Sequence, residues 1–467
     1  MDLGPEREYQ LRAAALLRAA ANDLKRHDAG AESDLGLPAG SFARLTSGDA
    51  PVTWPLIRRA CEIWPLNERD LLPIHDDCQE GVRIHRLASS IESSRIIARD
   101  GEPYYEYRDT AMSRVASYRP EWIRMLRSVQ DSSPENPTVK WNAGHLLYQF
   151  TYFVGPVNYY YRWDGISHCA EMTTGDSVWG VPFAPHSFTS RSQLQPAYIL
   201  ALTYGGAVVG DAQRELAVLG PSAARQLALP VGSGACAQGE LLRSFLRARM
   251  MPVGILAREA GLDPQRTSQL CRGEDPPAAG EIDAIARVLG VSARELLGVD
   301  TGAHGGVHLQ RHAGAPRWEY PCAANCAYRV VRLAGDPLHP HTTGLELEVV
   351  APTVAADGWL TTYQHQYLYL LGEHALALEW VHRGTRRSAV LAPGDSCYIL
   401  PAVPVAFCKA GQGEPRALLL RIGGAVTTDV RFALSTMAEG GIERYLEEDR
   451  VWYPVSSRDM SGMNDDR

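Results

Sequence analysis

The chain lacks any long hydrophobic run, since none of its apolar stretches approaches the roughly eighteen residues that a membrane-spanning helix needs. Its start, MDLGPEREYQLR, carries acidic residues and lacks the apolar core of a signal peptide. These two absences predict a cytoplasmic protein without a membrane anchor.

A basic surplus is absent as well. The 46 Lys and Arg residues are outnumbered by 54 Asp and Glu residues, which gives a formal net charge of −8. Because nucleic acids and anionic membranes attract basic surfaces, we expect neither of them as a general partner.

Cysteine is present, but without the spacing of a disulfide framework. The nine residues are scattered and odd in number, which predicts reduced thiols. Cys322 and Cys326 invite a metal interpretation, but no second Cys or His pair follows at zinc-site spacing, so a structural role is favoured.

Two segments repeat at a constant offset of 225 residues: Leu16, Gly36, Gly48 and Arg69 recur as Leu241, Gly261, Gly273 and Arg294. Each copy contains several short amphipathic stretches, such as the apolar face of Ile282, Ile285 and Leu289. The pattern resembles the small helix-turn-helix domain of the phage-repressor type.

A second repeat has an offset of 219 residues. The Gly175-Asp176 turn with Pro182 and Pro185 recurs as Gly394-Asp395 with Pro401 and Pro404. Around both copies lie alternating β-branched and aromatic runs punctuated by Gly and Pro, which are typical of an antiparallel jelly roll. This arrangement indicates a cupin barrel in each copy.

We therefore expect an α+β fold, mainly β, built as a tandem duplication of an all-α helix-turn-helix domain followed by a cupin barrel (a double-stranded β-helix, or jelly roll). The expected bounds are 1–80 for the first helix-turn-helix domain, 81–210 for a catalytic barrel, 211–238 for a linker, 239–300 for the second helix-turn-helix domain, 301–450 for a degenerate, structural barrel and 451–467 for a C-terminal tail.

The first barrel carries a candidate metal site. His145 and Gln149 stand four residues apart, so on a strand both side chains would point to the same face. His186 follows the Gly-Asp turn and completes a three-ligand set with open positions, as non-haem iron oxygenases need. A buried histidine without a metal, and a glutamine that only lines the barrel, are the alternatives.

The second barrel differs at the corresponding positions. Val405 stands where His186 stands in the first copy, and His365 remains without that partner. We therefore expect one iron-binding barrel and one scaffold.

Several separated motifs together resemble the hydroxyethylphosphonate dioxygenase-like family of non-haem iron cupin enzymes, which includes methylphosphonate synthase; hydroxypropylphosphonate epoxidase is a more distant relative. The segments are 99–109, 119–123, 144–145, 151–158 and 182–188. The resemblance covers nearly the whole chain and implies Fe(II), dioxygen and a small phosphonate, 2-hydroxyethylphosphonate, whose C–C bond is cleaved.

The resemblance also bears on the product. The dioxygenase releases hydroxymethylphosphonate and formate, and carries a glutamate six residues before its second histidine, where this chain has Gly180. The synthase releases methylphosphonate and an oxidised one-carbon product, and uses a glutamine at the position of Gln149. The resemblance therefore favours methylphosphonate here, with hydroxymethylphosphonate as the alternative.

By position in the family pattern, the resemblance implies Arg99, Tyr107 and Asn142 as phosphonate-binding residues. It also implies Lys25, supplied from the helical domain of a neighbouring subunit, so we expect a homo-oligomer. Its counterpart in the second repeat is Met250. A solvated Lys25, a core Tyr107 and a surface Arg99 are the alternatives, and no catalytic side chain beyond the iron centre is predicted.

A transcriptional regulator is the competing class, since helix-turn-helix domains are often joined to cupins in regulators. Residues 10–75 hold eight basic and eight acidic side chains, and residues 239–300 hold eight and nine. A domain that binds a DNA groove should be clearly basic, so an enzyme is favoured.

Overall fold

The protein is described here from a computed structural model, which describes residues 5–229, 234–297, 306–335, 339–354 and 358–446. Helices and strands are both present, and strands dominate between residues 82 and 204 and between 307 and 422. Within these ranges, no helix is long and apolar enough to cross a bilayer. The predicted C-terminal tail lies outside the described residues.

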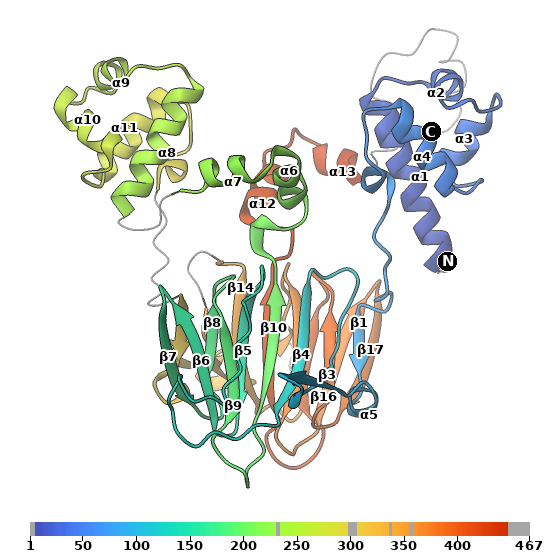
Figure 1. The fold of residues 1–467 in the computed structure, drawn as a ribbon. Helices are drawn as coiled ribbons and strands as arrows, with labels where there is room; N and C mark the ends of the chain where they lie inside the picture. Colours follow the sequence, from blue (N-terminus) through green and yellow to red (C-terminus); the bar gives the residue numbers. More distant parts are fainter. Residues whose placement is uncertain (1–4, 230–233, 298–305, 336–338, 355–357, 447–467) are drawn as a thin grey trace.

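Two layered sandwiches form the body of the protein (Figure 1). The first sandwich pairs the sheet β11-β8-β5-β10-β4-β3-β2 with the sheet β7-β6-β9, and the second pairs β1-β18-β15-β20-β14-β13-β12 with β17-β16-β19. The strands of the first are β2 (Arg95–Arg99), β3 (Glu102–Asp109), β4 (Tyr118–Met125), β5 (Tyr148–Val154), β6 (Val157–Trp163), β7 (Ile166–Met172), β8 (Ser177–Gly180), β9 (His186–Ser190), β10 (Tyr198–Tyr204) and β11 (Val307–Gln310). Those of the second are β1 (Val82–His85), β12 (Arg317–Tyr320), β13 (Tyr328–Arg332), β14 (Thr342–Val349), β15 (His365–Leu371), β16 (Leu376–His382), β17 (Thr385–Leu391), β18 (Ser396–Ile399), β19 (Val405–Lys409) and β20 (Arg416–Ile422).

Alternation along each strand divides the side chains between two cores. On β5, Phe153 faces the interior of the first sandwich, while Phe150 and Tyr152 face the other way. There they meet Tyr367 and Tyr369 of the second sandwich, so the two large sheets pack against each other through aromatic side chains.

Most of the labelled helices gather above one end of the strands, in two groups with short helices between them, whereas α5 (Leu87–Glu92) lies beside the strands near β3 and β16 (Figure 1). The first group contains α1 (Pro5–Asp23), α2 (Asp28–Leu35), α3 (Ser41–Thr46), α4 (Trp54–Ile63) and η1 (Glu68–Leu71); the second contains α8 (Gly234–Ala248), α9 (Val253–Ala260), α10 (Pro264–Arg272), α11 (Ala279–Leu289) and η3 (Ala293–Leu296). The others are η2 (Gly206–Val208), α6 (Asp211–Leu219), α7 (Pro221–Leu227), η4 (His312–Gly314), η5 (Ala323–Asn325), α12 (Thr428–Ser435) and α13 (Gly441–Leu446).

Within the segment expected as a linker, 211–238, the structure describes residues 211–229 and 234–238. They contain α6 and α7 and the start of α8, because their alanine and leucine residues favour helices more than their glycines oppose them. Gly210 and Gly220, both with positive φ, begin and end α6.

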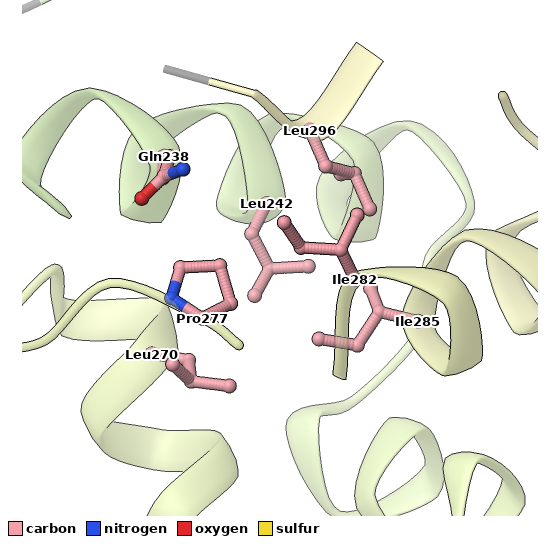
Figure 2. Close-up of a pocket in the computed structure, with 7 residues that line it drawn as sticks. All are labelled: Gln238, Leu242, Leu270, Pro277, Ile282, Ile285 and Leu296. Carbon is pink, nitrogen blue, oxygen red and sulfur yellow. The ribbon is translucent and has the colours of Figure 1, made fainter. Parts of the chain in front are cut away.

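Each helical group has its own apolar core. In the second group, seven side chains surround a cavity of about 10 Å³, which has room for nothing larger than a water molecule (Figure 2). The lining residues are Gln238, Leu242, Leu270, Pro277, Ile282, Ile285 and Leu296. This cavity is a feature of packing rather than a ligand site.

The two sandwiches exchange edge strands. β1 precedes the first sandwich in sequence but pairs with β18 of the second, and β11 precedes the second but pairs with β8 of the first. The sequence did not predict this exchange, because a four-residue strand that pairs with a distant partner leaves no local sequence pattern.

The repeated Gly-Asp turns hold the exchanged strands. Asp176 is 4% exposed and accepts hydrogen bonds from Arg311 Nη1 (2.9 Å) and the His312 amide (2.9 Å), both just after β11. Asp395 is 3% exposed and accepts from Arg86 Nη1 (2.7 Å) and the Leu87 amide (2.8 Å), both just after β1. The two buried carboxylates thus lock the halves together reciprocally.

We expect Asp176→Ala to lower the free energy of unfolding by about 3 kcal/mol, since it leaves buried donors without the charged acceptor. Chemical unfolding of both proteins measures the loss. The control is Asp211→Ala, which removes the exposed ion pair with Arg69 and should cost less than about 1 kcal/mol. Equal losses for the two variants would contradict the locking role of Asp176.

Candidate metal centre

Gln149 is the second residue of β5 and lies on its inner face, with Thr151 and Phe153. Its Nε2 donates to Thr151 Oγ1 at 2.9 Å, so the amide orientation is fixed. The Oε1 atom then faces His145, with 3.3 Å between Gln149 Oε1 and His145 Nε2.

His145 reaches this position from a loop. We expected it on the same strand as Gln149, which was wrong, because β5 begins only at Tyr148. Gly144 has a φ of 77°, and a Cβ there would lie 2.5 Å from the backbone of Phe183, so the chain turns tightly against the loop before β9. The turn brings His145 to Gln149 without strand periodicity.

His186 is the first residue of β9 and completes the group. The rings of His145 and His186 lie 5.3 Å apart, nearly perpendicular to each other. His145 Nδ1 is 2.9 Å from the Leu147 carbonyl, and His186 Nδ1 is 2.9 Å from the Ala184 carbonyl. A carbonyl accepts only, so both Nδ1 atoms carry the proton and both Nε2 lone pairs are available to a ligand.

The electrostatics favour a neutral His186. Burial is the main cause that lowers the pKa of His186 to about 4; the nearby His145 and Arg99 also lower it, and the hydrogen bond to the Ala184 carbonyl raises it. An imidazole must be neutral to bind a metal, so this histidine is ready to do so at neutral pH without releasing a proton.

The donor set fits a metal ion. His145, Gln149 and His186 line a cavity of about 10 Å³, together with Thr151, Tyr159 and Gly180. Two imidazole nitrogens and an amide oxygen suit a borderline cation such as Fe(II). Among the described residues, no group of three or more His, Cys, Asp or Glu side chains is placed to hold a metal ion.

Asn142 lies directly beside the group. Its Oδ1 accepts from the amides of His186 (2.8 Å) and Gly144 (3.0 Å), which fixes the side-chain amide. Its Nδ2 then lies 3.0 Å from His186 Nε2. The amide donor therefore points to the place that a ligand of the metal would occupy.

Arg99 lies next to the strand that carries His186, with its Nη1 3.4 Å from the Oγ of Ser187. Its guanidinium stacks on Tyr104 and Tyr105, with 5.1 and 4.9 Å from Cζ to the ring centroids, and donates to the Lys140 carbonyl. No carboxylate pairs with it within the described ranges. The charge of Arg99 is thus held in place by rings and a carbonyl and is left available to an anion.

Tyr107 lies on the inner face of β3, and burial raises its pKa to about 12. Beside it lies Glu121, which the sequence did not single out as a site residue. Glu121 accepts from Arg95 Nη2 at 2.9 Å, and burial raises its pKa although Arg95 and the more distant His145 lower it. Its alternate position on β4, two before the core residue Ile123, could have revealed it.

Lys25 lies elsewhere in its own chain. It follows α1, in the helical group above β1 and β17, whereas β5 and β9 lie on the other side of the molecule (Figure 1). Its side chain is exposed and donates to the Asp23 carbonyl at 2.7 Å. The structure thus brings together His145, Gln149, His186, Asn142 and Arg99, but not Lys25.

Comparisons with known proteins show the family of the chain. The chain is 36% identical to the methylphosphonate synthase of Nitrosopumilus maritimus over 455 residues, which are 97% of this chain and 98% of the relative. No family model matches it.

Among solved structures, one of the Streptomyces albus 2-hydroxyethylphosphonate dioxygenase, with its substrate 2-hydroxyethylphosphonate and Fe(II) bound, is 55% identical, with a TM-score of 0.91 over 96% of this chain and 100% of the other. A variant of 2-hydroxyethylphosphonate dioxygenase is 21% identical, with a TM-score of 0.74 over 92% and 99%, and shows the common fold. The chain belongs to the family of methylphosphonate synthase and 2-hydroxyethylphosphonate dioxygenase.

Proposed function

We propose that this protein is an Fe(II)- and dioxygen-dependent enzyme that cleaves the C–C bond of 2-hydroxyethylphosphonate. The observation that carries the proposal is the convergence of His145, Gln149 and His186, which brings two unprotonated Nε2 atoms and one amide oxygen together. The chain is also 55% identical to a dioxygenase with that substrate and Fe(II) bound. Bound iron would supply the activation of dioxygen that the oxidation requires.

The fold proposal that accompanies it is a tandem repeat of helix-turn-helix domain and cupin barrel, with the first barrel catalytic and the second structural. The matching strand orders of the two sandwiches and the paired helical groups support it. Within this frame we keep the domain bounds expected from the sequence as part of the proposal, with helices in 211–229 and at the start of α8, and with β1 and β11 each paired to the other half.

The side chains around the metal position would bind the phosphonate. Asn142 Nδ2 now lies against His186 Nε2, and it would be released to the substrate when that nitrogen binds the metal. Arg99, without a carboxylate partner among the described side chains, would balance the phosphonate charge. Tyr107 completes the group from β3, and Lys25 would come from a neighbouring subunit.

Two products are compatible with this reaction, because one dioxygen per substrate balances both. Hydroxymethylphosphonate forms with formic acid, and methylphosphonate forms with carbonic acid; neither route needs a reductant. The amide ligand Gln149, with Gly180 opposite it in the sheet, favours methylphosphonate. The chain is 55% identical to a dioxygenase and 36% identical to a synthase. Because the identity to the dioxygenase is the higher of the two, hydroxymethylphosphonate is the second candidate product.

We expect His186→Ala and His145→Ala to abolish both iron retention and turnover, because two remaining ligands hold iron weakly. Metal analysis after Fe(II) loading measures the first effect. The matched control is His168→Ala, since His168 stacks on Tyr161 in the same sandwich and should leave the iron content unchanged. Near-stoichiometric iron in His186→Ala would exclude this site, and two tightly bound irons in the wild type would exclude a structural second barrel.

A hybrid experiment tests Lys25. Lys25→Ala should weaken substrate binding while folding and iron content stay normal, and mixing it with His186→Ala subunits should restore activity, because one site then has both groups. The control mixture combines His186→Ala with His145→Ala, in which every site lacks a ligand and no recovery is expected. No recovery in the first mixture, after confirmed subunit exchange, would argue against donation between subunits.

Phosphorus NMR identifies the product directly. On anaerobic Fe(II) loading followed by oxygen and 2-hydroxyethylphosphonate, we expect methylphosphonate as the major signal, because a neutral ligand leaves the centre one charge unit more positive than a carboxylate would. Gln149→Ala should then lose iron affinity and activity. A dominant hydroxymethylphosphonate signal with accumulating formate would instead assign the chain to the dioxygenase branch.

A further inference from the structure

The second sandwich retains part of the metal site in the same register. In the first sandwich Gln149 pairs with Thr203 of β10, and in the second Gln366 pairs with Arg421 of β20. Both glutamines lie on the inner face, since the residues two further along, Thr151 and Leu368, also face inward. The amide is therefore kept, and the neighbouring threonine becomes an arginine.

The histidines are not retained. Thr362 stands four residues before Gln366, as His145 stands before Gln149. Val405 opens β19 as His186 opens β9, and it is fully buried in the apolar core. Of the three ligand positions, only the amide oxygen of Gln366 remains, and one amide oxygen does not bind a metal ion tightly.

Arg421 occupies the corresponding space. Its Nε donates to Gln366 Oε1 at 3.0 Å, so the guanidinium meets the same amide oxygen that faces the metal position in the first sandwich. Arg421 is partly buried, and burial lowers its pKa, but a guanidinium remains charged at neutral pH. The second sandwich thus carries a fixed positive charge at this place.

The guanidinium of Arg421 and the amide of Gln366 both have N–H groups without an acceptor among the described residues. Within the described ranges, Arg421 has no ion pair with a carboxylate, and its Nη groups have no hydrogen-bond partner. Gln366 is 0% exposed, and its Nε2 is buried without a partner. Thr343 of β14 lies opposite Arg421 on the neighbouring strand and adds a hydroxyl to the same inner face. A buried unpaired amide and a charge without a counter-ion are both costly, so a ligand that pairs with both would be stabilised.

We propose that Arg421, Gln366 and Thr343 form a second ligand site, for a small tetrahedral oxyanion of the phosphate or phosphonate class. A guanidinium presents parallel N–H groups that match two oxygens of such an anion, and the amide Nε2 supplies a donor from a second strand. The site needs no metal and lies in the half of the molecule without the metal centre, so it goes beyond the proposed reaction.

Arginine footprinting on the full-length, metal-free chain tests the site. Phenylglyoxal modifies accessible guanidinium groups, and mass spectrometry reports the rate at Arg421, Arg99 and Arg332 separately. We expect inorganic phosphate and methylphosphonate to protect Arg421, and acetate to protect it far less. Arg332 is exposed in the same sandwich and serves as the unprotected control. Protection of Arg99 reports on phosphonate binding in the first sandwich, and protection of Arg421 reports on the second. The proposed reaction and the proposed second site can therefore fail independently.

Gln366→Leu removes the amide donors and should raise the phosphate concentration for half-protection of Arg421 by about fivefold, the value of one neutral hydrogen bond, without changing that for Arg99. Calorimetry with phosphate gives an independent measurement, in which Arg421→Met should lose one binding event and Arg332→Met should lose none. If the methionine variant does not fold, Arg421→Lys keeps the charge but removes the parallel N–H groups of the guanidinium, and should still weaken phosphate binding. Protection of Arg421 that equals that of Arg332, or unchanged phosphate binding in Arg421→Met or Arg421→Lys, would overturn the proposal.

Discussion

The reciprocal exchange of edge strands is the constraint on which the rest of the structure depends. Asp176 and Asp395 each hold the backbone that follows the strand donated by the other half. With β11 in place, β8 is an interior strand, paired with β5 on one side and β11 on the other. Gly180, opposite Gln149, pairs with Val307 of β11. The wall of the candidate metal centre is therefore built partly by a strand from the second half of the chain.

One backbone frame with two different interiors explains how the halves diverged. The second residue of β5 and of β15 is a glutamine, Gln149 or Gln366, whose amide faces the interior of its sandwich. A buried amide oxygen needs a cationic or N–H partner. In the first sandwich the proposed cation is a metal held by two histidines, and in the second it is the guanidinium of Arg421. Loss of the histidines and gain of the arginine are thus coupled, because loss of the histidines alone would leave the Gln366 oxygen without a partner.

The sequence predicted the parts of this architecture that repeat or that have a fixed local geometry. The mainly β class and the family came from repeated turns and separated motifs. His145, Gln149 and His186 meet as expected, but for a different reason, since the turn at Gly144 and not strand periodicity brings His145 inward. The strand exchange was missed because β1 and β11 are four residues long and depend on partners far away in sequence. Gln366 was missed because the second copy lacks the two histidines that mark Gln149 in the first, with Thr362 and Val405 in their places.

Charge balance ties the ligand set to the substrate class. Two neutral imidazoles and one neutral amide add no charge, so a proposed Fe(II) keeps its full positive charge in a buried site. A phosphonate dianion has the opposite charge, and its attraction to this centre would be stronger than to one in which a carboxylate ligand had already cancelled part of the iron charge. The other acid nearby, Glu121, is already paired with Arg95, and the proton-bearing Nδ1 atoms of both histidines are directed to carbonyls. The centre is therefore complementary to a doubly charged ligand, and Asn142 and Arg99 set the side from which that ligand approaches.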